Sequence, residues 1–74
     1  MKMMTNLNIQ DEIGQSAGQI YNYLAGQTIP VTMTKMKKDL DMKSNFADLG
    51  LGWLAREDKV NIEKVGNSVK VNLK

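Results

Sequence analysis

The C-terminal stretch Val60-Asn61-Ile62-Glu63-Lys64-Val65-Gly66-Asn67-Ser68-Val69-Lys70-Val71-Asn72-Leu73-Lys74 decides the fold. Apolar and polar residues alternate on both sides of Gly66-Asn67, and this period of two is typical of half-buried β-strands. Gly-Asn suits the two-residue turn of a β-hairpin. The turn predicts the apolar pairs Ile62–Val71 and Val60–Leu73 on one face and the polar pairs Glu63–Lys70 and Asn61–Asn72 on the other. A shift of one residue would scatter the apolar pairs, so the pattern predicts the register as well as the hairpin.

Upstream of the hairpin, apolar residues recur at helical spacing in two segments that flank a short β-branched one. The first helix is predicted over residues 8–25, with Asn8 as its N-cap and Gly26 as its stop. Residues 27–31 contain Pro30, which has no N–H to donate, so a strand here can only be very short or at an edge. Thr32 then caps a second helix, in which Met33, Met36 and Leu40 share one face.

A third helix follows after the short connection at residues 41–43. Ser44 or Asn45 is its predicted cap, and it runs to about Glu57. Two helices joined by so short a connection form a helix-turn-helix. The order helix, short strand, helix, helix, hairpin predicts an α+β fold of the winged helix-turn-helix type, in which the hairpin is the wing. We expect residues 8–74 to form this single domain and residues 1–7 to be a disordered start.

The third helix is apolar nearly all round, so two orientations are considered. If Phe46, Leu49, Gly50 and Trp53 face the core, the outward residues are Ser44, Asp48, Leu51, Gly52 and Ala55. If Ala47, Leu51 and Leu54 face the core, as we prefer, the outward residues are Asn45, Asp48, Leu49, Gly52, Trp53 and Arg56. Neither outward face is cationic, and both include Asp48. A helix with so much apolar surface is usually buried on more than one side, which favours a protein partner in so small a domain.

Gly14 and Gly18 lie four residues apart inside the first helix, where each costs about 1 kcal/mol relative to Ala. Together they open one stripe of the helix surface. Our preferred interpretation is that another element of the chain crosses closely there. The alternative is a functional contact such as a dimer interface.

Composition excludes most kinds of chemistry. The 74 residues include no Cys and no His, so disulfides, thiolate metal sites and the usual general base are absent from the sequence. Neighbouring acids such as Asp11 and Glu12 diverge on a helix, and no phosphate-binding loop is present. We therefore expect no catalytic residue, no metal and no cofactor, and we predict that the protein is not an enzyme. Without a membrane-spanning stretch or a secretion signal, we expect a cytoplasmic location.

One run of residues also resembles the sequence of a known protein family. Leu51-Gly52-Trp53-Leu54-Ala55-Arg56-Glu57-Asp58-Lys59-Val60, together with Ile13-Gly14, Ala17-Gly18-Gln19-Ile20 and Leu24, resembles a family of short, stand-alone bacterial proteins with a winged helix-turn-helix domain and no assigned function. The resemblance spans nearly the whole chain, and Tyr21-Asn22 stands where an aromatic such as Trp is expected. It implies the fold and, by analogy, a transcription-related role. It supplies no operator, substrate or partner.

Two functions remain open. In the first, the protein binds double-stranded DNA, as a dimer, because this is the commonest use of the fold. The formal net charge of +2 is mild for a nucleic-acid-binding protein, but its basic surplus lies in residues 32–74. The candidate contact residues are Lys35, Lys37, Lys38, Lys43, Asn45, Arg56, Lys64, Asn67 and Lys70. The lysines would contact phosphates without reading sequence, although an ordinary solvated surface is the favoured interpretation of these lysines. Arg56 is equally compatible with an ion pair to Glu57 or Asp58. In the second, Leu49, Gly52 and Trp53 on the third helix contact another copy or another protein, without DNA.

Overall fold

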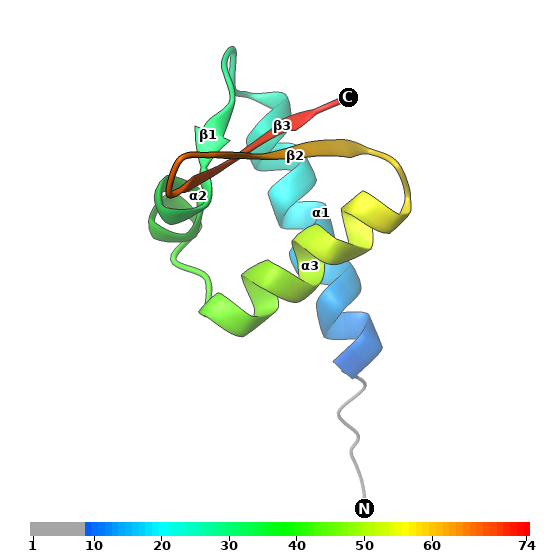
Figure 1. The fold of residues 1–74 in the computed structure, drawn as a ribbon. Helices are drawn as coiled ribbons and strands as arrows, with labels where there is room; N and C mark the ends of the chain where they lie inside the picture. Colours follow the sequence, from blue (N-terminus) through cyan, green and yellow to red (C-terminus); the bar gives the residue numbers. More distant parts are fainter. Residues whose placement is uncertain (1–8) are drawn as a thin grey trace, which may run out of the picture.

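The computed structural model describes residues 9–74. The elements follow in the order α1 (Ile9–Ala25), β1 (Val31–Thr32), α2 (Met33–Leu40), α3 (Ser44–Arg56), β2 (Val60–Val65) and β3 (Ser68–Leu73), as Figure 1 shows. This order confirms the predicted α+β winged helix-turn-helix arrangement. The expected disordered start at residues 1–7 and the expected N-cap at Asn8 lie outside the described residues. Within residues 9–74, no helix has the length and apolar character needed to cross a membrane.

The sheet has three antiparallel strands in the order β1-β3-β2. The predicted pairs are all present: Val60–Leu73, Asn61–Asn72, Ile62–Val71 and Glu63–Lys70. Gly66 opens the turn with φ of 61°, as the first position of a type II′ turn requires. Strand β1 lies at the edge of the sheet and begins directly after Pro30, so the constraint that this residue imposes on strand formation is confirmed.

The core lies between the helices and one face of the sheet, and it contains no charged or polar residue among residues 9–74. Its buried side chains are Ala17, Ile20, Leu24, Val31, Met36, Ala47, Leu51, Leu54, Val60 and Val71. Burial of Ala47, Leu51 and Leu54 confirms the preferred orientation of α3. The outward face of α3 is therefore the one that carries Asn45, Asp48 and Trp53.

Helices α1 and α3 approach each other closely at Gly50. A Cβ atom at this position would lie 3.0 Å from the Ala17 nitrogen and 3.1 Å from the Ser16 carbonyl carbon, both of which belong to the α1 backbone. A Cβ at Gly14 or Gly18 would meet nothing within 4 Å. The prediction of a close crossing at Gly14 and Gly18 is therefore wrong, because the packed stripe of α1 runs through Ala17 and leaves both glycines beside it.

The two helix starts of the helix-turn-helix differ in how they are capped. At α2 the Thr32 Oγ1 accepts a hydrogen bond of 3.1 Å from the Lys35 backbone nitrogen, which confirms Thr32 as the cap. At α3 the N-cap residue is Lys43, without a side-chain cap, so the expected cap at Ser44 or Asn45 is wrong. The Ser44 hydroxyl instead accepts a hydrogen bond from Lys37 Nζ at 3.0 Å, which takes it away from the helix start.

Candidate nucleic-acid interface

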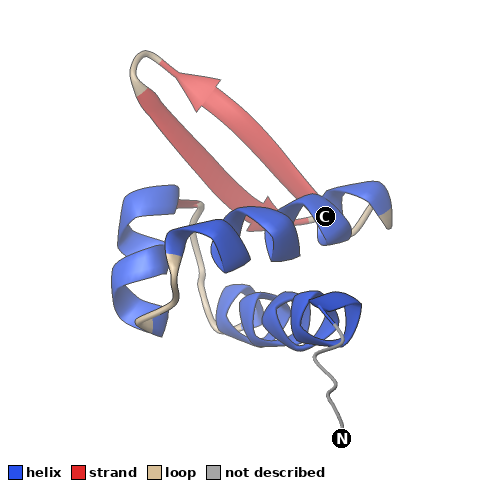
Figure 2. Ribbon diagram, turned by 90° about the horizontal axis from the view of Figure 1, so that it is seen from below, coloured by secondary structure: helices blue, strands red, loops and turns tan. Residues whose placement is uncertain are grey.

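The helix-turn-helix and the wing meet at one end of the molecule. A hollow there is lined by Thr32, Met33 and Thr34 from the start of α2 and by Asn67, Ser68 and Val69 from the wing. In Figure 1 the tip of the hairpin overlaps α2 in projection, and α3 runs away from this end toward its own C-terminus, while Figure 2 shows the tip projecting away from the helices. The fold thus brings the predicted contact residue Asn67 close to the helix that carries three of the predicted lysines.

Lys35 is held by a carboxylate rather than left free. Its Nζ lies 2.6 Å from Asp39 Oδ2, which also accepts a hydrogen bond of 2.6 Å from the Tyr23 hydroxyl. The hydrogen bonds from Lys35 and Tyr23 lower the pKa of Asp39, and the bond to Asp39 raises the pKa of Lys35. Burial and the bond to Asp39 raise the pKa of Tyr23. This cluster links α1 to α2, and within it the positive charge of Lys35 is paired with the Asp39 carboxylate.

Lys37 joins α2 to α3. Its Nζ lies 3.0 Å from Asp48 Oδ1 and also donates to the Ser44 hydroxyl. Asp48 is the residue of α3 that would repel a phosphate, so this ion pair offsets its charge. Lys37 is thereby committed to a contact within the chain instead of being available to DNA.

Five of the predicted cations make no ion pair within residues 9–74. They are Lys38, Lys43, Arg56, Lys64 and Lys70. The two cations of the described chain that were not predicted are both engaged, since Lys59 lies 5.8 Å from the centre of the Tyr21 ring and Lys74 pairs with Asp58. The alternative of an Arg56 ion pair to Glu57 or Asp58 is not realised. The positive charge without an internal partner therefore coincides with the predicted DNA contacts.

The predicted contact residues without an ion pair do not form one continuous patch. Successive residues of a strand point to opposite faces, so the register puts Lys64 on the face of Ile62 and Lys70 on the face of Glu63. Asn45 is exposed in the first turn of α3 and Arg56 ends that helix; at 1.5 Å per residue they are about 16 Å apart along the axis. Lys38, Lys43 and Asn45 lie at the α2–α3 connection, whereas the wing contacts the start of α2 and Arg56 ends α3.

The outward face of α3 is apolar along its middle. Leu49 is 45% exposed and Trp53 is 48% exposed, and Gly52 between them is exposed as well. Base edges in the major groove are read mostly by Arg, Lys, Asn and Gln. On this face only Asn45 and the distant Arg56 are of those types, so α3 is poorly equipped to read sequence.

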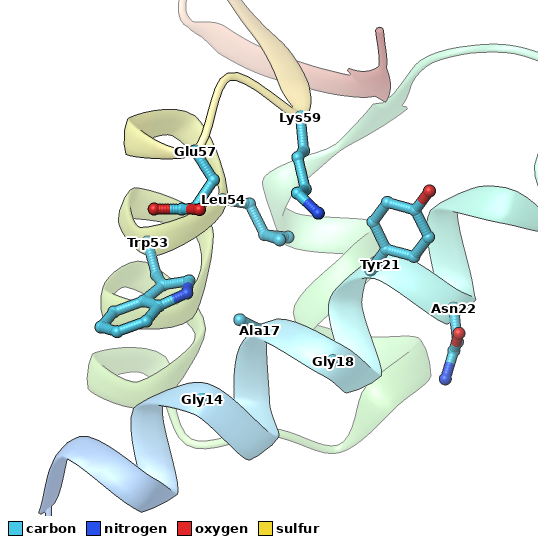
Figure 3. Close-up of a pocket in the computed structure, with 9 residues that line it drawn as sticks. All are labelled: Gly14, Ala17, Gly18, Tyr21, Asn22, Trp53, Leu54, Glu57 and Lys59. Carbon is cyan, nitrogen blue, oxygen red and sulfur yellow. The ribbon is translucent and has the colours of Figure 1, made fainter.

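A second feature escaped the sequence analysis. Beside the crossing of α1 and α3 lies a hollow of about 290 Å³, lined by Gly14, Ala17, Gly18, Tyr21, Asn22, Trp53, Leu54, Glu57 and Lys59. Figure 3 shows Trp53 and Tyr21 on either side of it, with Glu57 and Lys59 along one edge. We call it the α1–α3 groove. The spacing of Gly14 and Gly18 was the signal for it, but the same spacing fits a close crossing equally well.

No group of three His, Cys, Asp or Glu residues in the described part of the chain could hold a metal ion. The arrangement offers hydrogen-bond donors, positive charge and apolar surface. Such groups can contact anions around α2 and the wing, and apolar surfaces along α3.

Replacing Asp39 with asparagine is expected to reduce the loss of stability at acidic pH. The pKa of Asp39 is lower in the folded chain than its ordinary 3.8, so its contribution is complete above that value and is lost as the pH falls through the folded pKa. Melting temperatures from circular dichroism at neutral and acidic pH check this. D39N should show a smaller difference between the two than the wild type, whereas D41N, which alters an exposed carboxylate without an ion pair, should match the wild type. If D39N and the wild type lost equal stability at acidic pH, the Asp39 carboxylate would not contribute to the pH dependence of stability.

Comparison with known proteins identifies the family of the chain and a solved structure with a similar fold. A family described as "Winged helix-turn-helix domain (DUF2582)" matches residues 4–73. An uncharacterised protein of the archaeon Methanocaldococcus jannaschii, MJ1608, is 34% identical over 64 residues, covering 85% of this chain and 91% of that protein. The solution NMR structure of protein BT2368 from Bacteroides thetaiotaomicron matches with a TM-score of 0.78 at 23% identity, covering 89% of this chain and 79% of that chain. The archaeal relative means that the similarity extends beyond the bacterial proteins implied by the sequence resemblance.

Proposed function

The chain belongs to this winged helix-turn-helix family, and from that premise we propose that it binds double-stranded DNA as a dimer, in a transcription-related role. The observation that carries the proposal is the distribution of unpaired charge. All cations of residues 9–74 that lack both a carboxylate and an aromatic partner are among the predicted contacts, and most lie around α2 and the wing. This proposal implies a cytoplasmic location and a non-enzymatic role.

The proposed contacts are mainly to phosphate. Lys38 lies in the last turn of α2 and Lys43 directly precedes α3. Lys70 and Asn67 belong to the wing, which in this fold touches an adjacent groove or phosphate. Asn45 is the residue best placed to reach a base, because it lies in the first turn of α3. With most of the outward face apolar, binding should depend strongly on salt and weakly on sequence.

Titration of labelled random-sequence duplex DNA, followed by fluorescence anisotropy at several salt concentrations, tests the proposal. Three or four phosphate contacts per chain predict that log K falls with log salt with a slope of about −3 to −4. Absence of any anisotropy change at high protein concentration and low salt would refute DNA binding.

Two variants of the same helix separate free from committed lysines. Lys38→Gln removes an unpaired charge, and we expect it to make the salt slope shallower by about 1. Lys35→Gln removes a charge that Asp39 already holds, so the slope should stay at the wild-type value. Equal slopes for the two variants would show that the ion pairs of α2 do not decide which lysines reach DNA.

A second candidate function is a protein-binding module that uses Leu49, Gly52 and Trp53. The exposure of Leu49 and Trp53 on the outward face of α3 favours it, because apolar and aromatic side chains are efficient anchors at protein interfaces. If this function alone is correct, neither the wild type nor the Leu49→Ala variant binds DNA. If DNA is bound through phosphates as proposed, Leu49→Ala retains the wild-type salt slope.

A further inference from the structure

Two glycines line the α1–α3 groove although packing within the chain leaves room for larger residues. Gly14 and Gly18 form part of its lining, yet a Cβ at either would meet no atom within 4 Å. Each glycine costs about 1 kcal/mol relative to Ala inside a helix. Packing within the chain therefore does not require these two residues to be small.

The edge of the groove carries charges of both signs. Glu57 and Lys59 both line it, and neither forms an ion pair within residues 9–74. Lys59 instead lies over the Tyr21 ring. Beside the groove stands Trp53, the largest side chain that α3 leaves partly exposed. One surface thus holds a bulky apolar side chain, a hollow lined in part by two glycines, one acid and one base.

Such a surface is complementary to itself. In a dimer with two-fold symmetry the same patch meets its own copy, so each projection needs a hollow and each charge an opposite one on that patch. We propose that the α1–α3 groove is the contact between two copies of this chain. Trp53 of each copy enters the groove of the other over Gly14 and Gly18, and Glu57 of each pairs with Lys59 of the other.

The groove suits a side chain better than a small ligand. Its volume of about 290 Å³ is at or below the lower end of the roughly 300–1,000 Å³ of small-molecule sites. Its polar groups stand at the edge, as in protein interfaces with an apolar centre and a polar rim. The nine residues that line the groove are fewer than the 20–30 per partner of a standard interface, so we expect a weak dimer with a dissociation constant on the order of 100 µM.

The proposed contact leaves the DNA-binding end free. The groove involves Trp53, Leu54 and Glu57 near the C-terminal end of α3, whereas Lys43 and Asn45 lie at its N-terminal end. In Figure 2 the tip of the hairpin projects on one side of α3 and α1 lies on the other. The inference supplies the dimer of the proposed function, but it concerns a separate surface and can fail separately.

Sedimentation velocity on the full chain without DNA tests it, from about 10 µM to about 1 mM protein. The wild type should shift from monomer to dimer over this range. Gly18→Leu fills the groove and should weaken the dimer by at least about tenfold. Because a Cβ at Gly18 meets open space, this variant should fold, which circular dichroism checks. Gln19→Leu adds the same side chain at the next, exposed position outside the groove and should dimerise as the wild type does.

Charge reversal tests the pairing itself. Glu57→Lys alone and Lys59→Glu alone each place like charges together in a two-fold dimer, and each should weaken it by about tenfold or more. The double variant E57K/K59E restores opposite charges and should dimerise as the wild type does. A wild type that stays monomeric throughout the range overturns the inference, and so does a dimer that survives Gly18→Leu or that the double swap fails to restore. Loss of the dimer in Gly18→Leu with the salt slope per chain retained would separate this surface from the DNA contacts.

Discussion

Replacing Gly50 with leucine is expected to lower the free energy of unfolding by about 3 kcal/mol or more, a large share of the total stability of so small a domain. A Cβ at this position already comes within 3.0–3.1 Å of Ala17 and Ser16 backbone atoms, which cannot rotate away as a flexible side chain would. The larger leucine side chain can be accommodated only if α1 moves off α3. Because α1 and α3 bury much of the core between them, that movement would also expose Ile20.

Urea unfolding followed by circular dichroism measures this effect, and the same helix supplies the control. A Cβ at Gly52 meets nothing within 4 Å, so Gly52→Leu should raise helix stability by up to about 1 kcal/mol. Gly50→Ala should fall between the two, since its clash is partly offset by the same gain in helix propensity. A Gly50→Leu variant as stable as Gly52→Leu would show that the two helices are not held at the distance described.

The hairpin and the core face of α3 could be predicted from sequence because each depends on a local period. Alternation around Gly66-Asn67 fixes the pairing, since a shift of one residue would put apolar side chains into solvent. For α3, the set Ala47, Leu51 and Leu54 gives a continuous stripe at helical spacing. The Thr32 cap is also local, since donor and acceptor lie within one turn.

What could not be predicted depends on how separate elements meet. The ion pair between Lys37 and Asp48 joins two helices, and its existence depends on the angle between them. That contact also takes Ser44 into a hydrogen bond across the turn, which explains why the expected cap does not form. A pair of helix glycines has the same sequence pattern whether it faces a neighbouring backbone or open space. Only the position of α3 decides that Gly50 makes the close approach and Gly14 does not.

The division of charge between committed and free lysines follows from the same geometry. Asp39 and Asp48 each hold one lysine of α2, so two of the three acids in the helix-turn-helix are already compensated inside the chain, and only Asp41 makes no ion pair within residues 9–74. Other cations of the helix-turn-helix, among them Lys38 and Lys43, form no ion pair with a carboxylate within residues 9–74. A phosphate contact by these residues therefore breaks no existing ion pair, which is why the salt slope is the measurement that distinguishes them from Lys35.

Replacing Ile20 with alanine is expected to lower the free energy of unfolding by about 2–5 kcal/mol. Ile20 is fully buried, and its Cδ1 lies 3.1 Å from the Cβ position of Gly50, at the crossing of α1 and α3. Truncation there removes apolar contacts and leaves a cavity that the two helix backbones, already in close contact, cannot collapse to fill. Ile29→Ala removes the same atoms from a side chain that is 70% exposed and should change stability by no more than about 0.5 kcal/mol. Urea unfolding of both variants measures the difference, and a similar loss in the two would mean that Ile20 is not at the centre of the core.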